Sequence, residues 1–141
     1  SLPVVINSGS GNQGITVSMP VIVYAGETGA DEEMLYRALI VSNLISVHQK
    51  RYIGNLSAYC GAVSAGTAAV CGIAYLDGAD YDIIGRIIIN SLGNVGGIVC
   101  DGAKSSCAAK IASAVEAGLL AYEMAKNGRT FAFEEGLVHH P

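Results

Sequence analysis

An uncharged stretch rich in small residues runs through the middle of the chain, from Leu56 to Leu76. Ala, Gly, Ser and Thr fill most positions between Ser57 and Tyr75, so other helix backbones can approach this segment closely. A membrane span is the competing interpretation, because the stretch has about the length that a bilayer requires. It is poor in Leu and Ile, however, and Asp77 follows it directly, which favours a buried helix. We therefore expect a central helix around which the remaining chain packs.

Three further segments predict helices. The first lies between Thr28 and Arg51, where an N-cap precedes an acidic first turn. Its apolar residues recur at helical spacing: Leu35, Leu39, Ile40 and Leu44. Asp80–Asn90 carries isoleucines that can line a helix face, although their β-branching would also suit a strand. Ala103–Asn127 is rich in Ala, with Lys110 directed to solvent, and Gly128 supplies the expected left-handed stop.

The chain is short of charge, and this bears on what surrounds it. Only 14% of its residues are charged and 51% are hydrophobic, whereas soluble domains carry roughly 25% charged residues. The chain opens with Ser1 and stops at Pro141 after a short polar tail, so we expect a fragment of a longer protein whose other parts cover some of this surface. A net charge of −4 with scattered basic residues argues against nucleic acid. The start carries no signal-peptide pattern, and a reducing cytoplasm is the expected location.

A glycine-rich turn near the start, Gly9–Gly14, matches G-x-G-x-x-G, and Leu2–Asn7 before it would be a short strand. Dinucleotide-binding folds open an unbroken helix with this motif, whereas Pro20 interrupts the next run, Ile15–Ala25, and leaves its structure ambiguous. Such a turn can also present successive N–H groups to a small carboxylate. Four side chains would add donors: Ser8, Ser10, Asn12 and Gln13. A tight turn with no ligand is the equally weighted alternative.

The cysteines fall into two kinds. Cys60, Cys71, Cys100 and Cys107 are 11, 29 and 7 residues apart and form no C-x-x-C pair, which argues against structural zinc. The histidines are poorly placed to complete a zinc site or a Cys–His nucleophile: His48, His139 and His140. Cys71 is expected to be a core residue. Cys100 and Cys107 follow the flexible Gly93–Gly97 stretch near a predicted helix start, which favours the thiolate form and makes them candidate ligands or reactive thiols.

Three motifs in the same order give the chain a specific likeness. They are Ser8-Gly9-Ser10-Gly11-Asn12-Gln13-Gly14, Cys60-Gly61-Ala62-Val63-Ser64-Ala65-Gly66 and Val99-Cys100-Asp101-Gly102-Ala103-Lys104-Ser105-Ser106-Cys107-Ala108. Through nearly its whole length the chain resembles the C-terminal part of the L-cysteine desulfidase family, which is related to the α domain of iron–sulfur L-serine dehydratases.

The resemblance implies a [4Fe–4S] cluster held by Cys60, Cys100 and Cys107, with one iron left open to act as a Lewis acid. It implies a deaminating β-elimination that converts L-cysteine to pyruvate, ammonia and sulfide, or L-serine to pyruvate and ammonia. The Ser8–Gly14 turn would then hold the substrate carboxylate, and Lys104 is a candidate for substrate contact. The general base stays unknown. Full-length relatives have an N-terminal portion that contributes to the active site, so we expect this fragment to be inactive alone.

The expected fold is mainly α, a helical bundle with buried small-residue helices and glycine-rich loops, and residues 1–141 are expected to form a single α-helical domain. The expected partners are a small amino acid and the missing N-terminal portion of the same protein, without nucleic acid or membrane, and homo-oligomerisation stays open. The alternative is a non-enzymatic helical interaction module whose cysteines are structural core residues. Anaerobic cluster reconstitution would separate the two.

Overall fold

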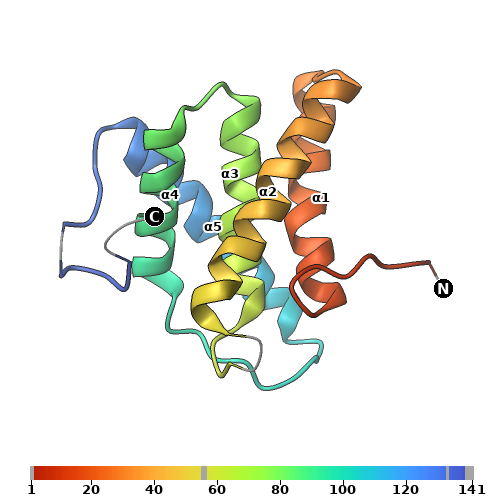
Figure 1. The fold of residues 1–141 in the computed structure, drawn as a ribbon, viewed down its shortest axis with the longest axis vertical. Coiled ribbons are helices and arrows are strands. Elements are labelled where there is room, and N and C mark those ends of the chain that lie inside the picture. Colours follow the sequence, from red (N-terminus) through yellow and green to blue (C-terminus); the bar gives the residue numbers. More distant parts are fainter. Residues whose placement is uncertain (1, 55–56, 133, 139–141) are drawn as a thin grey trace.

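The computed structural model describes residues 2–54, 57–132 and 134–138, and it confirms a mainly α fold (Figure 1). Within these ranges the chain forms five helices: α1 (Gly11–Thr28), α2 (Glu32–Ile53), α3 (Gly61–Leu76), α4 (Tyr81–Val95) and α5 (Cys107–Lys126). The only β-type pairings among the described residues are two isolated bridges. None of the helices in this part of the chain combines the length and the apolar character needed to cross a bilayer.

Helix α3 is the centre of the bundle, as its small-residue composition predicts. Every residue from Ala62 to Ala74 is buried, and α3 packs against each of the other four helices. Close approach depends on glycine: a Cβ on Gly66 would lie 2.7 Å from the Ala114 Cβ of α5. On the other side, a Cβ on Gly72 would lie 2.9 Å from Val21 of α1. Helices α1 and α2 pack together beside α3, and so do α4 and α5.

Helices α1, α3 and α5 run in the same direction, and α2 and α4 run against them (Figure 1). At the end where the three parallel helices finish, the hydroxyls of Tyr24 and Tyr122 donate to the two carboxylate oxygens of Asp77, at 2.6 and 2.8 Å. We call this the tyrosine end. At the opposite end the helices begin, and Gln13 of α1 packs against Gly61 of α3.

All four predicted helices form, with shifted boundaries. The N-cap of α2 is Asp31, whose carboxylate accepts from Met34 N–H at 2.8 Å. Helix α4 continues past Asn90 to Val95, and α5 begins at Cys107, later than expected. Gly128 has the predicted left-handed backbone, with φ of 73°.

The segment around Pro20 corrects two expectations. Pro20 lies inside α1 without ending it, and Leu2–Asn7 forms no strand. A proline weakens the preceding turn of a helix by removing an N–H donor. The N–H that Pro20 lacks would have paired with the Thr16 carbonyl, and at the next residue the buried Ser42 hydroxyl of α2 donates to the Val17 carbonyl at 2.8 Å, which ties this turn to α2. Packing against α2 therefore stabilises a helix that α1 alone would form poorly.

Candidate functional site

Three helix N-termini meet at one end of the bundle. Helices α1, α3 and α5 begin there at Gly11, Gly61 and Cys107. The contact between Gln13 and Gly61 joins the first two, and the packing of Gly66 against Ala114 aligns the third. Each helix N-terminus carries a partial positive charge, so this end of the molecule favours thiolates and carboxylates. We call it the cysteine end, because Cys60, Cys100 and Cys107 lie in the segments that form it.

Backbone pairing places Cys60 and Cys100 on either side of a single bridge. An isolated antiparallel bridge joins Tyr59 to Val99. The N–H groups of Cys60 and Cys100 flank it and donate to carbonyls of the opposite segment at 2.9 and 2.6 Å. Because side chains alternate along extended backbone, Cys60 and Cys100 emerge on the face of this ladder opposite to Tyr59 and Val99. Cys60 is also the residue that precedes the first turn of α3.

Cys107 completes the set as the first residue of α5. Cys107 as a whole is 8% exposed. The sulfur lies 3.5 Å from Lys104 N–H and 3.6 Å from the Gly102 carbonyl, so it sits inside the loop that begins at Cys100. Cys60 is likewise buried, whereas Cys100 is exposed. Two of the three thiols are therefore held at helix starts, and the third is open to solvent.

Lys110 holds this loop from within α5. Its ammonium donates to the Val99 carbonyl at 3.1 Å and to the Asp101 carboxylate at 2.6 Å. Lys104 pairs with the other oxygen of Asp101 at 3.4 Å. The hydrogen bond from Lys110, together with the charge of Lys104, lowers the pKa of Asp101. The loop between Cys100 and α5 is thus tied back onto the helix that follows it.

The sequence predicts Lys110 at the solvent, and the structure places it at the surface but only partly exposed. The Lys110 side chain is 22% exposed and engaged in the loop. Its hydrogen bond to Asp101 raises its pKa, and the neighbouring Cys60 and Cys107 add to the shift. Nine residues separate Lys110 from Asp101, so no helical spacing in the sequence indicates the pair.

The glycine-rich turn is built as a cap for α1. Ser8 and Gly9 have positive φ, 52° and 102°, as a tight mirror-image turn requires. Ser10 Oγ accepts from both the N–H and the side-chain amide of Gln13, each at 3.1 Å. Ser8 Oγ donates to Asn7 at 2.6 Å. The hydroxyls of Ser8 and Ser10 and the amide nitrogen of Gln13 therefore already have partners within the turn, while Asn12 lies partly exposed in the first turn of α1.

The predicted site residues lie at the same end of the molecule. Gln13 links the turn to Cys60 through Gly61, and its side-chain oxygen is buried with no hydrogen-bond partner among the described atoms. Lys104 lies on the cysteine loop with its side chain 58% exposed. Cys71 is separate: it is fully buried in α3, and burial raises its pKa to about 12. Its expected role as a core residue is consistent with that position.

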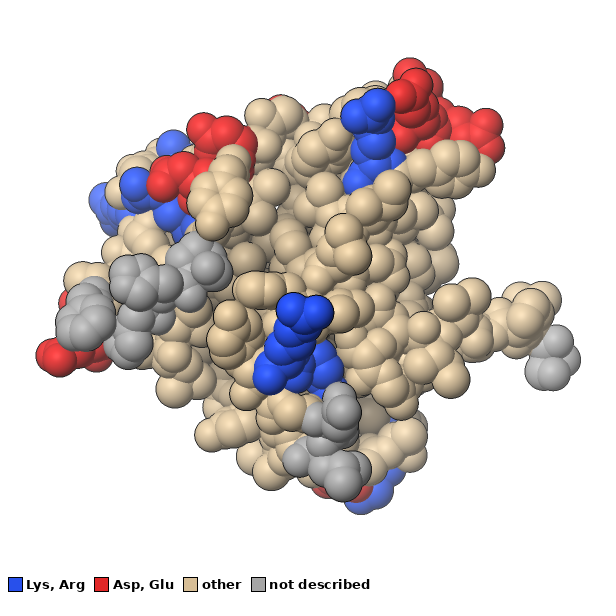
Figure 2. Space-filling view, in the orientation of Figure 1, with Lys and Arg blue, Asp and Glu red and all other residues tan. Residues whose placement is uncertain are grey.

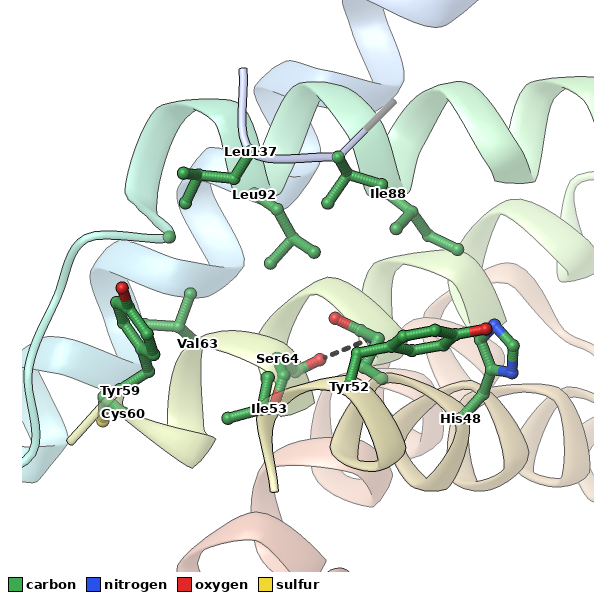
Figure 3. Close-up of a pocket in the computed structure, with 13 residues that line it drawn as sticks. His48, Tyr52, Ile53, Tyr59, Cys60, Val63, Ser64, Ile88, Leu92 and Leu137 are labelled. Carbon is green, nitrogen blue, oxygen red and sulfur yellow. Dashed lines mark hydrogen bonds between the residues drawn. The ribbon is translucent and has the colours of Figure 1, made fainter. Parts of the chain in front are cut away.

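A mainly apolar cavity of about 540 Å³ adjoins Cys60 (Figure 3). Ile88, Leu92 and Leu137 line one side of it, and the end of α2 lines the other with Tyr52 and His48. Beneath it, the Gln49 amide donates to the Ser64 carbonyl at 3.1 Å, and the Gln49 oxygen is buried with no partner among the described atoms. Sequence reasoning missed this cavity, because its walls come from segments far apart in the chain. His139 and His140 lie outside the described residues.

The donor chemistry at the cysteine end suits iron, because thiolates are the usual ligands of iron–sulfur clusters. Among the described residues, however, no group of three or more His, Cys, Asp or Glu side chains is arranged to hold a metal ion. The chain therefore supplies three suitable donors on converging segments, and the described conformation does not present them as one closed site.

Comparison with known proteins gives a consistent picture. The family model of the serine dehydratase alpha chain matches residues 1–140. The UPF0597 protein DSY1109 of Desulfitobacterium hafniense is 59% identical over 137 residues, which are 97% of this chain and 32% of the relative. UPF0597 proteins of Treponema denticola and Finegoldia magna are 56% and 55% identical over 138 residues, 98% of this chain and 32% and 33% of theirs. The chain thus spans about a third of the length of these curated relatives. No solved structure matches it.

Proposed function

The chain belongs to the serine dehydratase alpha chain family, and on that premise we propose that the full-length protein is a deaminating β-eliminating lyase. Its substrate is a small amino acid, L-serine or L-cysteine. The elimination removes the α-proton and the β-hydroxyl or β-thiol, which leaves as water or hydrogen sulfide. The resulting enamine takes up one water and releases pyruvate and ammonia.

The observation that carries this proposal is the convergence of three helix N-termini on the segments that contain Cys60, Cys100 and Cys107. A substrate carboxylate and thiolate ligands are all anionic, and each is stabilised by unpaired N–H groups and the positive ends of helices. The tyrosine end offers the opposite environment, since the helices finish there at a carboxylate.

We assign Cys60, Cys100 and Cys107 as the residues that would hold a [4Fe–4S] cluster. When bound, such a cluster supplies a Lewis acid to the leaving hydroxyl or thiol. Loading would require the three thiols to form a closed group, and Cys100 is the exposed member of the three. The contacts of Lys110 with Val99 and Asp101 hold the Cys100 segment close to the start of α5.

The chain's own part in substrate binding falls to the Ser8–Gly14 turn. Its N–H groups and the partly exposed Asn12 would bind the carboxylate, with Ser8, Ser10 and Gln13 shaping the turn through their mutual hydrogen bonds. Lys104 on the cysteine loop would contribute a positive charge toward the same substrate. The general base would come from the part of the full-length protein that lies outside this chain, so residues 1–141 alone are expected to form no pyruvate.

The ligand assignment is tested by anaerobic reconstitution of the full-length protein with iron and sulfide. A broad absorbance in the visible-blue region and bound iron should be lost in Cys60→Ala, Cys100→Ala and Cys107→Ala. Cys71→Ala is the matched control, because Cys71 is buried in α3 and should retain the cluster. Equal iron content in all four variants would contradict the assignment.

The reaction is tested separately by incubating the reconstituted full-length protein with L-serine and with L-cysteine. Pyruvate should form from at least one of them, with equimolar sulfide when the substrate is cysteine. Asn12→Ala should raise KM more than it lowers kcat, because Asn12 is assigned to carboxylate binding. A reconstituted protein that forms pyruvate from neither amino acid would overturn the proposed activity.

A further inference from the structure

The outer faces of α1 and α2 carry a large share of the exposed apolar side chains. Eight of them are between 40% and 62% exposed: Ile15, Met19, Ile22, Val23, Tyr36, Ile40, Leu44 and Val47. The four on α2 recur at helical spacing, so they form one ridge along that helix. We call these eight residues the apolar layer.

The apolar layer is a second apolar face, distinct from the core face of the same helices. Val17 and Val21 of α1 and Ala38 of α2 are fully buried against α3 or between the two helices. A helix at the surface of a free-standing domain has one apolar stripe and a polar outer face. Helices α1 and α2 instead have apolar residues on both sides, which is the pattern of elements buried between two layers.

Charged residues are also scarce on the outer faces of α1 and α2. Helix α1 contains one charged residue, Glu27, and α2 has its charges only near its ends, with none between Arg37 and Lys50. Helix α5 is different and carries charge along its length, at Lys110, Glu116, Glu123 and Lys126, whereas α4 has Asp82 and Arg86 in its first two turns. Figure 2 shows that charged side chains on the face toward α2 form a few separate groups with a broad uncharged surface between them.

We propose that the rest of the full-length polypeptide packs on the apolar layer and buries it. The curated relatives are about three times as long as this chain, so roughly two thirds of each polypeptide is available to cover it. A segment of the same chain is present at a high effective concentration, which favours an internal contact over association with a second copy. Free proteins rarely leave large apolar patches open to solvent. This proposal is independent of the lyase activity, because it depends only on the two outer faces and the length of the relatives.

Thiol labelling in the full-length protein tests the proposal directly. Met19→Cys and Leu44→Cys each place a thiol in the apolar layer, and Leu120→Cys is the matched control. Leu120 is 55% exposed, close to the 62% of Leu44, but it lies on α5 beside Glu116 and Glu123. Maleimide labelling at each site is followed by peptide mass spectrometry, in native buffer and in urea. Native labelling at positions 19 and 44 should be slowed about tenfold or more relative to urea, and at position 120 by no more than about threefold.

Dilution separates the two possible occupants. Protection of Met19→Cys and Leu44→Cys that is unchanged over a hundredfold dilution supports coverage by the same polypeptide. Protection that is lost on dilution, together with a smaller mass by light scattering, would assign the layer to a second copy and overturn the proposal. Native labelling at both positions as fast as at Leu120→Cys would also overturn it, whatever the protein's activity.

Discussion

The tyrosine end and the cysteine end of the bundle are held by different kinds of contact. At the tyrosine end, side chains from three helices meet, because Tyr24 and Tyr122 both donate to Asp77. At the cysteine end, backbone segments meet through the hydrogen bonds of Cys60 and Cys100. Neither α3 nor α5 has a side-chain N-cap hydrogen bond among the described residues, although α1, α2 and α4 do.

The difference indicates that the two ends of the parallel helices have different roles: one end holds the bundle together and the other is open to a ligand. Side-chain hydrogen bonds fix the helix C-termini relative to one another, while α3 and α5 begin without a side-chain cap, and the N–H groups of Cys107 and Ala108 pair with carbonyls of the preceding loop. Unpaired N–H groups at a helix start bind anions well. A bundle fastened at one end can therefore offer the other end to a ligand. Four predictions test this difference between the two ends, beginning with the packing of α3 against α5, on which both ends depend.

The largest effect is expected from Gly66→Ala, which affects the contact between α3 and α5. The new Cβ would lie 2.7 Å from the Ala114 Cβ, so the helices must move apart at a cost of about 2 kcal/mol. Gly26→Ala is the matched control. Nothing lies within 4 Å of its new Cβ on α1, and this change should stabilise by about 0.5 kcal/mol or more. Urea unfolding measures both, and equal midpoints would show that close packing of α3 on α5 is unimportant.

Tyr122→Phe should weaken the tyrosine end without disturbing the cysteine end. The buried ring remains and only the hydrogen bond to Asp77 is lost, which should lower the free energy of unfolding by about 1 kcal/mol. Iron content after reconstitution should match that of the unchanged protein. Loss of iron in this variant would mean that the two ends are coupled rather than independent.

Lys110→Met should loosen the cysteine end alone. The variant keeps the length of the side chain but loses the contacts with Val99 and Asp101, so amide hydrogens of the loop 99–106 should exchange about tenfold faster. The urea midpoint should change little, because the contacts lie at the surface. Lys126→Met removes a comparable surface pair with Glu123 and should leave loop exchange unchanged. Unaltered amide exchange of the loop in Lys110→Met would show that Lys110 does not hold the loop in place.

The smallest effect is a difference in alkaline stability. Burial, followed by the hydrogen bond to Asp77, raises the pKa of Tyr122, and the same carboxylate raises that of Tyr24. The unfolded chain then loses these protons first, so their stabilisation is complete below about pH 10 and is lost as the pH rises further. The decline of unfolding free energy above pH 10 should be shallower in Tyr122→Phe. Tyr81 is 82% exposed, so in Tyr81→Phe the unfolding free energy should decline with pH as it does in the unchanged protein.

Much of the helical architecture could be predicted from local pattern. The small-residue run became the central helix α3, and Asp31 and Gly128 mark helix ends in the expected way. Pro20 misled the prediction for α1, because a proline penalty is local whereas the stabilising contact from Ser42 comes from another helix. The assignment of Cys60, Cys100 and Cys107 as ligands came from a family resemblance and stays a proposal.

The sequence by itself determined that the segments of α2 to α5 are helical, which helix is buried and where the thiols fall along the chain, because these follow from composition and near-neighbour spacing. Only the tertiary structure decided that three helices start at the same end, that Lys110 holds the cysteine loop and that α1 and α2 have a second apolar face. Those features depend on the directions in which helices pack, and direction is set by contacts between residues far apart in sequence. Three glycines of α3 illustrate this, because at each one a side chain is excluded by the neighbouring helix that packs against it: Gly61, Gly66 and Gly72.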